Sequence, residues 1–394
     1  MGKKKECRCG LTHPIVDDFN GYDFNVSGKR SNEQINEQIN EQICKGDKKR
    51  FRGIVRYWGA RFHGFQRQTI PFSGEYQWTV PTIQSALEES FSRVLHIVRP
   101  HETVIGLHSY TINEPGKAIG PEFGAPTSVV VTGSSRTDAG VHALGQVIHV
   151  DVPLSSWGTF PLNEFKQRVN NDINSDKIEI TYLEEVPSGE LFDANRGNTG
   201  KRYCYVIYDG KTTPAGEGNC AFQDMFSQQL RMHKPDSIKQ LDVGLMNQVA
   251  ETLGSNTSWD FRLFTRLGHR NSKSNLVRTI WDAKVFRRDT LDLLDVADGS
   301  IPLMKGSPNG DYIHFVVEGP GFLFLMVRCI MHVLIQVGRG NMSVEEFFEK
   351  SFNSDNHGEC HRAADPVGLT LLRVYFSDIE AFQGKLQYVH QGRY

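Results

Sequence analysis

The densest group of residues that could do chemistry lies in one polar segment, Ser134-Ser-Arg-Thr-Asp-Ala-Gly-Val-His142. Within it, Asp138 has Arg136 two positions before it and His142 four positions after it. A carboxylate with an ordinary pKa of about 3.9 is ionised at neutral pH, and a neighbouring guanidinium favours that form further. Asp138 therefore suits a nucleophile better than an acid. The structural alternative is a turn in which the carboxylate accepts hydrogen bonds from nearby backbone N–H groups.

A second group of residues mixes basic and aromatic side chains. It comprises Arg61-Phe-His-Gly-Phe-Gln-Arg67 and Lys201-Arg-Tyr-Cys-Tyr205. Basic side chains can hold phosphates while an aromatic face stacks on a nucleic-acid base. However, Tyr203 and Tyr205 alternate along an expected strand and so share one face, which is equally typical of cross-strand packing.

The third group lies in the most apolar stretch of the chain, from Gly321 to Gly338. Arg328, His332 and Gln336 recur every four residues there and therefore line one side of an expected helix. A charge on such a helix needs a partner. An aspartate at a cleft would supply one, but a buried Arg–Asp pair is also a common structural device. Because Arg328 would be costly in lipid and the stretch is short, it indicates a buried helix rather than a membrane span.

The elements that must position these groups alternate between strands and helices without regular βαβ spacing. Two β-branched runs, 128–132 and 146–151, bracket the Asp138 segment, and a strand at 54–57 precedes the first basic segment. Further strands are expected at 202–208, 312–318 and 368–376. Helices are expected at 82–96 with Thr82 as N-cap, 242–253 closed by Gly254, 321–338, and 343–352 opened by a capping box at Ser343. This order favours an α+β fold with a mixed, mainly antiparallel sheet.

Length and composition set the class of protein. The chain has 394 residues, of which 39% are hydrophobic and 23% charged, as in an ordinary soluble globular protein. The net charge of −2 excludes a wholly basic, histone-like binder, so a nucleic-acid partner would need a local basic surface. Seven scattered cysteines do not form a secreted disulfide framework. Without a signal-peptide pattern, we expect an intracellular protein of the cytoplasm or nucleus, with the mitochondrion left open.

The two ends of the chain and four internal segments look peripheral. Residues 1–50 are expected to form a disordered, low-complexity tail, and 381–394 a shorter one. Cys7, Cys9 and His13 in the first tail lack a second ligand pair at the usual spacing, so no metal site is expected. The polar, Gly-rich and Pro-rich segments are expected to be surface insertions; they are 69–80, 100–126, 209–235 and 289–310.

Taken together, the motifs resemble the TruA-type tRNA pseudouridine synthase family. The catalytic loop of that family is similar to Ser135-Arg-Thr-Asp-Ala-Gly-Val-His-Ala143 followed by Gly145-Gln-Val. The similarity continues in the same order through further segments of the chain, which are 57–68, 192–194, 201–205, 260–261, 277–280, 322–338 and 364–369. The resemblance implies two ferredoxin-like halves with flanking helices around a central cleft, here 51–186 and 187–380, in a homodimer that binds tRNA.

The resemblance also implies roles for individual residues. Asp138 matches the catalytic aspartate, and Arg328 matches the arginine that pairs with it. Three residues match the substrate-binding set: Tyr203 lies against the uracil, Arg136 helps displace the target base, and Leu369 forms an apolar wall. Arg61, Arg67 and Lys201 are candidates for RNA phosphate contacts.

The implied reaction explains these residue types. It breaks the N1–C1′ bond of uridine, turns the bound uracil and rejoins it through C5, so no cofactor is expected. Asp138 would act as a nucleophile at C1′, as a nucleophile at C6, or as the base that forms a glycal, and the sequence does not choose among them. Reaching C1′ requires the nucleotide to leave its stack at a cost of a few kcal/mol.

Two points remain open at this stage. One departure from the family pattern is Asn195, which stands where an arginine is usual, with Arg196 displaced by one position. This puts the family's RNA contact there in doubt. The alternatives to a tRNA-modifying enzyme are an RNA-binding protein of the same fold without turnover, and an enzyme of the same chemistry that acts on messenger or ribosomal RNA.

Overall fold

The structure is a computed structural model. It describes residues 48–71, 77–95, 129–154, 157, 161–173, 177–188, 190–210, 240–266, 275–291, 293, 296–297, 304–307, 309–353 and 360–376. The expected tails and the segment 100–126 lie outside the described residues, apart from Lys48, Lys49 and Arg50. These three residues already belong to the first strand, so the fold begins slightly earlier than the sequence predicts.

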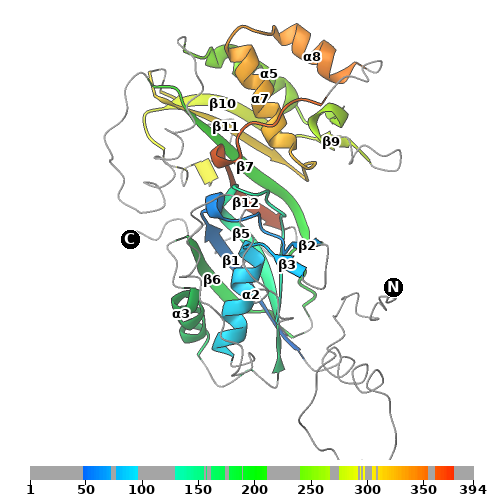
Figure 1. The fold of residues 1–394 in the computed structure, drawn as a ribbon. Coiled ribbons are helices and arrows are strands. Elements are labelled where there is room, and N and C mark those ends of the chain that lie inside the picture. The colour runs from blue at the N-terminus through cyan, green and yellow to red at the C-terminus, as the bar shows by residue number, and fades with distance from the viewer. Residues whose placement is uncertain are drawn as a thin grey trace, which may run out of the picture.

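One mixed sheet of eight strands forms the centre of the molecule (Figure 1). Its order is β10-β11-β7-β12-β5-β1-β6, and β4 also pairs with β5. Its strands are β1 (Lys48–Tyr57), β4 (Val130–Gly133), β5 (His142–Pro153), β6 (Ile178–Glu185), β7 (Asn198–Tyr208), β10 (Asp282–Arg288), β11 (Tyr312–Gly319) and β12 (Leu369–Phe376). Every neighbouring pair is antiparallel except β12 and β5. The predicted α+β class with a mainly antiparallel sheet is confirmed.

Helices pack on the sheet in two groups. The described helices are α2 (Ile83–Val94), α3 (Leu162–Ile173), α5 (Val243–Leu253), α7 (Met326–Gly338) and α8 (Val344–Phe352). In Figure 1, α2 and α3 lie over the half that contains β1 and β6, whereas α5, α7 and α8 lie over the half that contains β10 and β11. The predicted N-caps at Thr82 and Ser343 form, since each side chain accepts a backbone N–H, and Asp242 caps α5 in the same way.

One helix begins later than predicted. The apolar stretch from Gly321 becomes helical only at Met326, because Leu325 before it has the left-handed φ of 67°. A left-handed residue cannot continue a right-handed helix toward its N-terminus. The residues from Gly321 to Leu325 therefore form a separate loop ahead of α7.

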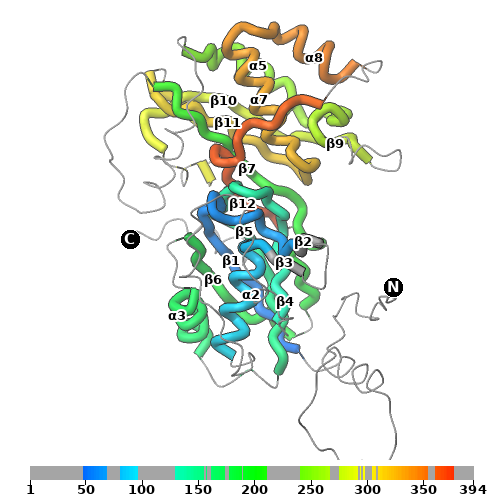
Figure 2. Tube along the Cα trace, in the orientation of Figure 1, coloured from blue at the N-terminus to red at the C-terminus, as the bar shows by residue number. Residues whose placement is uncertain are grey.

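The two halves of the sheet meet along β5 and β12. Residues 148–151 of β5 pair with β4, whereas His142 and Ala143 pair with β12 in parallel. β12 is the last strand of the chain, and Figure 2 shows it between β5 and β7. A Cβ on Gly145 would lie 2.3 Å from the carbonyl oxygen of Leu372, so only glycine allows the two strands to approach this closely. The loop 134–141 leaves the sheet at this junction.

Two smaller hairpins complete the described fold. β2 (Thr69–Pro71) pairs with β3 (Gln77–Thr79), and β8 (Ser258–Asp260) pairs with β9 (Val277–Thr279). Part of the predicted surface insertion 289–310 is in fact core. Four of its residues are buried against Cys204, Val206 and Leu372, namely Leu291, Leu293, Val296 and Ala297. The Gly and Pro content of that segment led to the prediction of a surface insertion, but its apolar residues cover the other face of the sheet. Among the described residues, no helix has the length and apolarity to cross a membrane.

Candidate active site

The loop that carries Asp138 is fastened to the loop that follows β1. The N–H of Phe65 donates to the carbonyl of Thr137 at 3.0 Å, and the N–H of Gly140 donates to the carbonyl of Phe62 at 3.2 Å. Gly64 lies between these contacts with a φ of +91°, and a Cβ there would lie 2.7 Å from the oxygen of Thr137. The glycine in the sequence Phe-His-Gly-Phe therefore serves backbone approach to the Asp138 loop.

Buried polar side chains hold the base of the same loop. Gln146 is fully buried, and its amide accepts from the N–H of Ser135 at 3.2 Å and donates to the carbonyl of Ser135 at 2.5 Å. The hydroxyls of Tyr57 and Thr137 are 2.7 Å apart. These contacts fix the backbone on both sides of Asp138. Among the described residues, no group of this loop forms a hydrogen bond with the Asp138 carboxylate.

His142 is a structural residue rather than an acid or base. Its Nδ1 accepts the N–H of Gly59 at 3.1 Å, and its Nε2 lies 3.0 Å from the carbonyl of Val367. Complete burial lowers the pKa of His142 to about 3. The imidazole is therefore neutral, with its proton on Nε2 donated to Val367. It ties the first strand's loop to the segment just before β12.

Asp138 meets Arg328 across the junction of the two halves. Nη1 of Arg328 lies 3.2 Å from Oδ2 of Asp138, and both side chains are more than four-fifths buried. Nε of Arg328 donates to the carbonyl of Ala364 at 2.8 Å, which orients the guanidinium. Burial raises the pKa of Asp138, while the charges of Arg328 and, more weakly, Arg266 oppose that rise. A partly desolvated carboxylate beside a guanidinium results.

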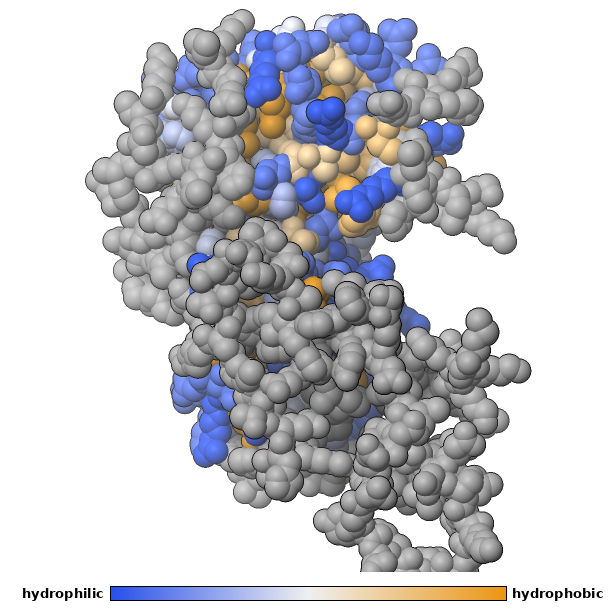
Figure 3. All heavy atoms as spheres, viewed as in Figure 1, coloured by the Kyte–Doolittle hydropathy of each residue, from blue (hydrophilic) through white to orange (hydrophobic). Residues whose placement is uncertain are grey.

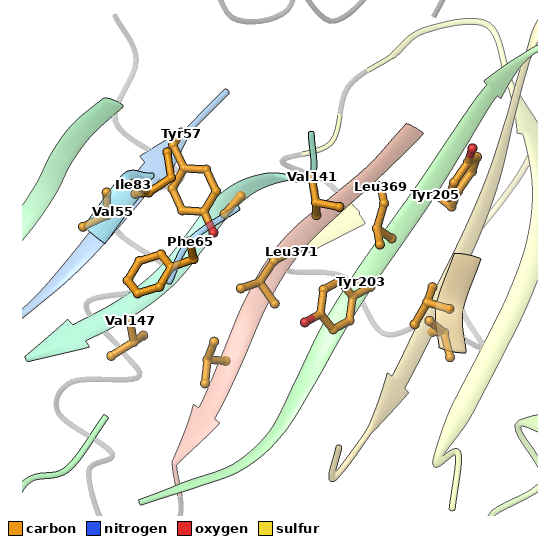
Figure 4. Packing of buried hydrophobic residues seen from close by; sticks show 14 of the residues in the cluster. Val55, Tyr57, Phe65, Ile83, Val141, Val147, Tyr203, Tyr205, Leu369 and Leu371 are labelled. Atoms are coloured by element: carbon orange, nitrogen blue, oxygen red, sulfur yellow. The ribbon is translucent and has the colours of Figure 1, made fainter. Parts of the chain in front are cut away.

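Tyr203 on β7 lies next to this pair. Its hydroxyl is 2.7 Å from Oγ of Ser135, and its ring meets the ring of Phe322 edge-on at 5.4 Å. Burial raises the pKa of Tyr203 to about 12, and the negative charge of Asp138 acts in the same direction. In Figure 4, the Tyr203 hydroxyl points away from β11 toward the strand that carries Leu371.

Leu369 and Tyr205 lie at the neighbouring positions of the same strand pair. Leu369 is buried, pairs with Tyr205 across β12 and β7, and lies near Tyr203 in Figure 4. The hydroxyl of Tyr205 donates to the carbonyl of Asp365 at 2.7 Å. The two tyrosines therefore share a face, as their alternation predicts, but only Tyr203 bonds to the Asp138 loop.

The structure separates the other basic residues into different environments. Arg136 and Arg61 are exposed, and neither forms an ion pair with a described residue. Arg67 is paired with Glu88, at 2.8 Å. Lys201 is largely buried, donates to Oδ1 of Asn198 at 2.6 Å, and has its pKa lowered to about 8 by burial.

Three residues near Asp138 escaped the sequence analysis. Ser135 had no role assigned because only the fold shows that it faces Tyr203. Phe322 was included only as part of a helix. Arg266 lies over the ring of Phe324 at 5.2 Å and acts electrostatically on Asp138. Its signal was weak, since a lone arginine after Phe264-Thr265 has no recognisable spacing to the aspartate.

The segment that departs from the family pattern forms a turn around Asp193. Oδ1 of Asp193 accepts the N–H groups of Asn195 and Arg196 at 2.8 and 2.9 Å, and both side chains are exposed. Among the described residues, no group of three or more His, Cys, Asp or Glu side chains could hold a metal ion.

Comparisons with known proteins identify the family of this chain. A family model described as tRNA pseudouridine synthase matches residues 254–377, which include Arg328 and β12. The chain is 31% identical over 249 residues to tRNA pseudouridine synthase A 2 of Clostridium perfringens, covering 63% of this chain and 83% of that protein. The chain belongs to the tRNA pseudouridine synthase A family. It is therefore an isomerase of the class that converts uridine to pseudouridine in tRNA.

Other members of the tRNA pseudouridine synthase A family match over most of their length. The protein of Listeria innocua is 26% identical over 325 residues, 82% of this chain and 98% of its own. The protein of Prochlorococcus marinus is 28% identical over 333 residues, 84% of this chain and 86% of its own. These relatives are bacterial and do not support the nuclear or mitochondrial location considered above.

Proposed function

We propose that Asp138 is the catalytic carboxylate with which this pseudouridine synthase isomerises uridine in tRNA. The observation that carries the proposal is the ion pair between Asp138 and Arg328, with Tyr203 beside it, at the junction of the two halves. The pair is poorly solvated, and Asp138 lies on a loop whose backbone is held by other contacts. The loop does not need this carboxylate for its own structure, so the carboxylate can act on a substrate.

The reaction needs only groups that this chain supplies. The N1–C1′ bond breaks, the C5–C1′ bond forms, and the proton of C5 is replaced by one on N1, so substrate and product are isomers. Asp138 acts on the ribose or on the uracil, at C1′, at C6, or as the base that forms a glycal. Arg328 favours the ionised state of Asp138 and orients it. Electrostatic preorganisation of this type costs nothing at the moment of reaction.

The target nucleotide must leave its stack to reach Asp138. Tyr203 provides the face on which the uracil rests, and its hydroxyl and ring edge are both fixed by neighbours. Leu369 provides an apolar wall. Arg136 is exposed two residues before Asp138 and takes the place of the displaced base in the RNA stack. Unstacking costs a few kcal/mol, which stacking and phosphate contacts offset.

Of the three basic residues expected to contact RNA, Arg61 fits best. It is exposed in the loop that fastens the Asp138 loop. Lys201 is a weaker candidate because burial holds its ammonium group away from solvent. Arg67 balances the charge of buried Glu88, so we assign it to the stability of the N-terminal half instead. We also propose a homodimer, on the strength of the family resemblance.

The test is position-resolved mapping of pseudouridine. Purified wild-type and Asp138→Asn proteins are incubated with unmodified tRNA transcripts, and the modified positions are read by chemical sequencing. We expect modification by the wild type alone, with similar tRNA affinity for both proteins. Modification by Asp138→Asn at an undiminished rate would overturn the assignment of Asp138. Binding without modification by the wild type would overturn the activity.

A further inference from the structure

The polar side of α7 continues beyond the residue that pairs with Asp138. His332 lies one helical turn after Arg328, and Arg339 follows at the C-cap of the helix. At a rise of about 1.5 Å per residue, His332 is about 6 Å and Arg339 about 16 Å along the axis from Arg328. These residues are half-buried, so they lie at the border between helix packing and solvent.

A second segment adds another arginine beside His332. Residues 360–365 run along α7, because the N–H of Ala364 donates to the carbonyl of Arg328 at 3.0 Å and Sγ of Cys329 donates to the carbonyl of His361 at 3.4 Å. These two contacts hold Arg362 next to the helix. Its side chain is exposed.

Among the described residues, no acid forms an ion pair with any of the three residues of this cluster. Burial and the charges of Arg362 and Arg339 lower the pKa of His332. No group of α5, α8, β7 or Arg262–Phe264, the described elements packed against α7, acts on His332 to a comparable degree. On α8, Glu346 is used by Ser343 and Lys350.

One nitrogen of the Arg339 guanidinium also lacks a partner among the described residues. This atom is Nε, which is buried and has no hydrogen-bond partner among the described residues. Arg328, on the same helix, by contrast donates to both Asp138 and Ala364. Two neighbouring guanidinium groups that no described acid pairs with are suited to an anion with several acceptor oxygens, such as a phosphate.

We propose that His332, Arg339 and Arg362 form a phosphate-binding surface for the tRNA backbone, leading away from Asp138 along α7. The inference rests on the proposed function, because the cluster continues the same polar side of the helix as Arg328. Hydrophobic and hydrophilic side chains alternate over α5 and α7 in Figure 3, so the surface there is not uniformly apolar. From His332 to Arg339 the cluster spans about 10 Å of the helix axis, enough to contact two successive phosphates.

The cluster makes RNA binding and proton uptake interdependent. In the free protein, two neighbouring cations disfavour the imidazolium form of His332. A bound phosphate reverses that local potential and raises the pKa of His332. Binding is then accompanied by proton uptake, so tRNA affinity strengthens as pH falls from 8 to 6.

The experiment measures tRNA affinity of the full chain at several salt concentrations and at pH 6 and 8. The variants are Arg362→Gln, Arg339→Gln and His332→Gln. The matched control is Arg168→Gln, which removes the same charge from an exposed helix residue already paired with Glu164. Each arginine variant is expected to reduce the slope of log affinity against log salt by about 0.7 to 1. His332→Gln is expected to remove part of the pH dependence.

The outcomes separate this inference from the activity. Wild-type turnover tests the proposed function, whereas the salt slope tests the phosphate surface. If the wild type modifies tRNA and Arg362→Gln keeps the control's slope, the surface is overturned and the enzyme assignment stands. Should Arg339→Gln melt at a lower temperature, the exposed Arg362→Gln variant and the charge reversal Arg362→Glu still decide the question. If the tRNA affinity of His332→Gln depends on pH as that of the wild type does, His332 is not part of the phosphate-binding surface.

Discussion

The two halves of the molecule contribute to the site in different ways. The N-terminal half presents Asp138 on a loop, held by backbone contacts from Phe62 and Phe65 and by the buried amide of Gln146. The C-terminal half presents Arg328 from a helix and Tyr203 from a strand. The carboxylate that we propose as the reactive group is therefore on irregular backbone, whereas the groups proposed to orient it are on regular elements.

The two halves have opposite effects on the pKa of Asp138. Burial in the Asp138 loop raises the pKa of the carboxyl, and the guanidinium groups of Arg328 and Arg266 from the other half counteract the rise. The carboxyl group is poorly solvated, and the two guanidinium groups favour its charged form. This teaches that neither half alone sets the reactivity, and that loss of the contact across the junction has consequences that differ from damage within one half.

The largest expected effect comes from removing the N-terminal half's reactive group. Asp138→Asn keeps the size of the side chain but removes the carboxylate, so we expect turnover to fall by roughly 10⁴-fold or more. Affinity for tRNA should change little, because phosphate contacts and stacking supply most of it. Single-turnover assays and a binding titration measure the two effects. A comparable loss of affinity would mean that Asp138 mainly shapes the RNA surface.

The next effect comes from removing the C-terminal half's charge. Arg328→Gln takes away the group that favours the ionised carboxylate, so the pKa of Asp138 rises further above its usual range. Activity requires the ionised form, which is present above this pKa and lost as pH falls through it. We expect turnover to drop by about 10²-fold near neutral pH. The acidic limb of the pH profile should move to higher pH.

The pH profile of Arg328→Gln is compared with that of Arg262→Gln. Arg262 is an exposed arginine that pairs with Asp260 and makes no recorded contact with Asp138. An acidic limb that stays in place in Arg328→Gln would show that the guanidinium only positions the loop. A shift in both variants would indicate a general charge effect.

A change confined to the N-terminal half should affect stability rather than chemistry. Arg67→Gln leaves the buried carboxylate of Glu88 without its ion pair, and burial already raises the pKa of Glu88. We expect the free energy of unfolding to fall by about 2 to 3 kcal/mol at neutral pH. Chemical denaturation followed by fluorescence measures the loss. Unchanged stability combined with weaker tRNA binding would show that Arg67 contacts RNA rather than stabilising the fold.

The smallest effect comes from one neutral contact between the halves. Tyr203→Phe and Ser135→Ala each remove the same hydroxyl pair, so each should slow turnover about fivefold, as expected for roughly 1 kcal/mol. The double variant should be no slower than either single one. Tyr203→Ala, which also removes the stacking face, should be much more damaging. Equal damage from Tyr203→Phe and Tyr203→Ala would mean that the hydroxyl, not the ring, matters.

Much of the local structure follows from the sequence. The helix caps at Thr82 and Ser343 and the β-branched runs around the Asp138 loop were predicted, because caps and alternation act over a few residues. The short strands β2, β3, β8 and β9 were not predicted, and neither were α3, β6 and β10. Their sequences are mixed in polarity, and packing against the sheet decides their structure.

The sequence by itself determined the carboxylate that we propose as the reactive group, the loop that carries it and, through the resemblance, its pairing with Arg328. Only the tertiary structure decided which basic residues remain available. In the folded protein, Arg67 forms an ion pair with Glu88, Lys201 is largely buried and Arg61 remains exposed. It also placed Ser135 against Tyr203. The physical reason is that propensity and spacing act along the chain, whereas charge pairing and desolvation depend on neighbours that only folding brings together.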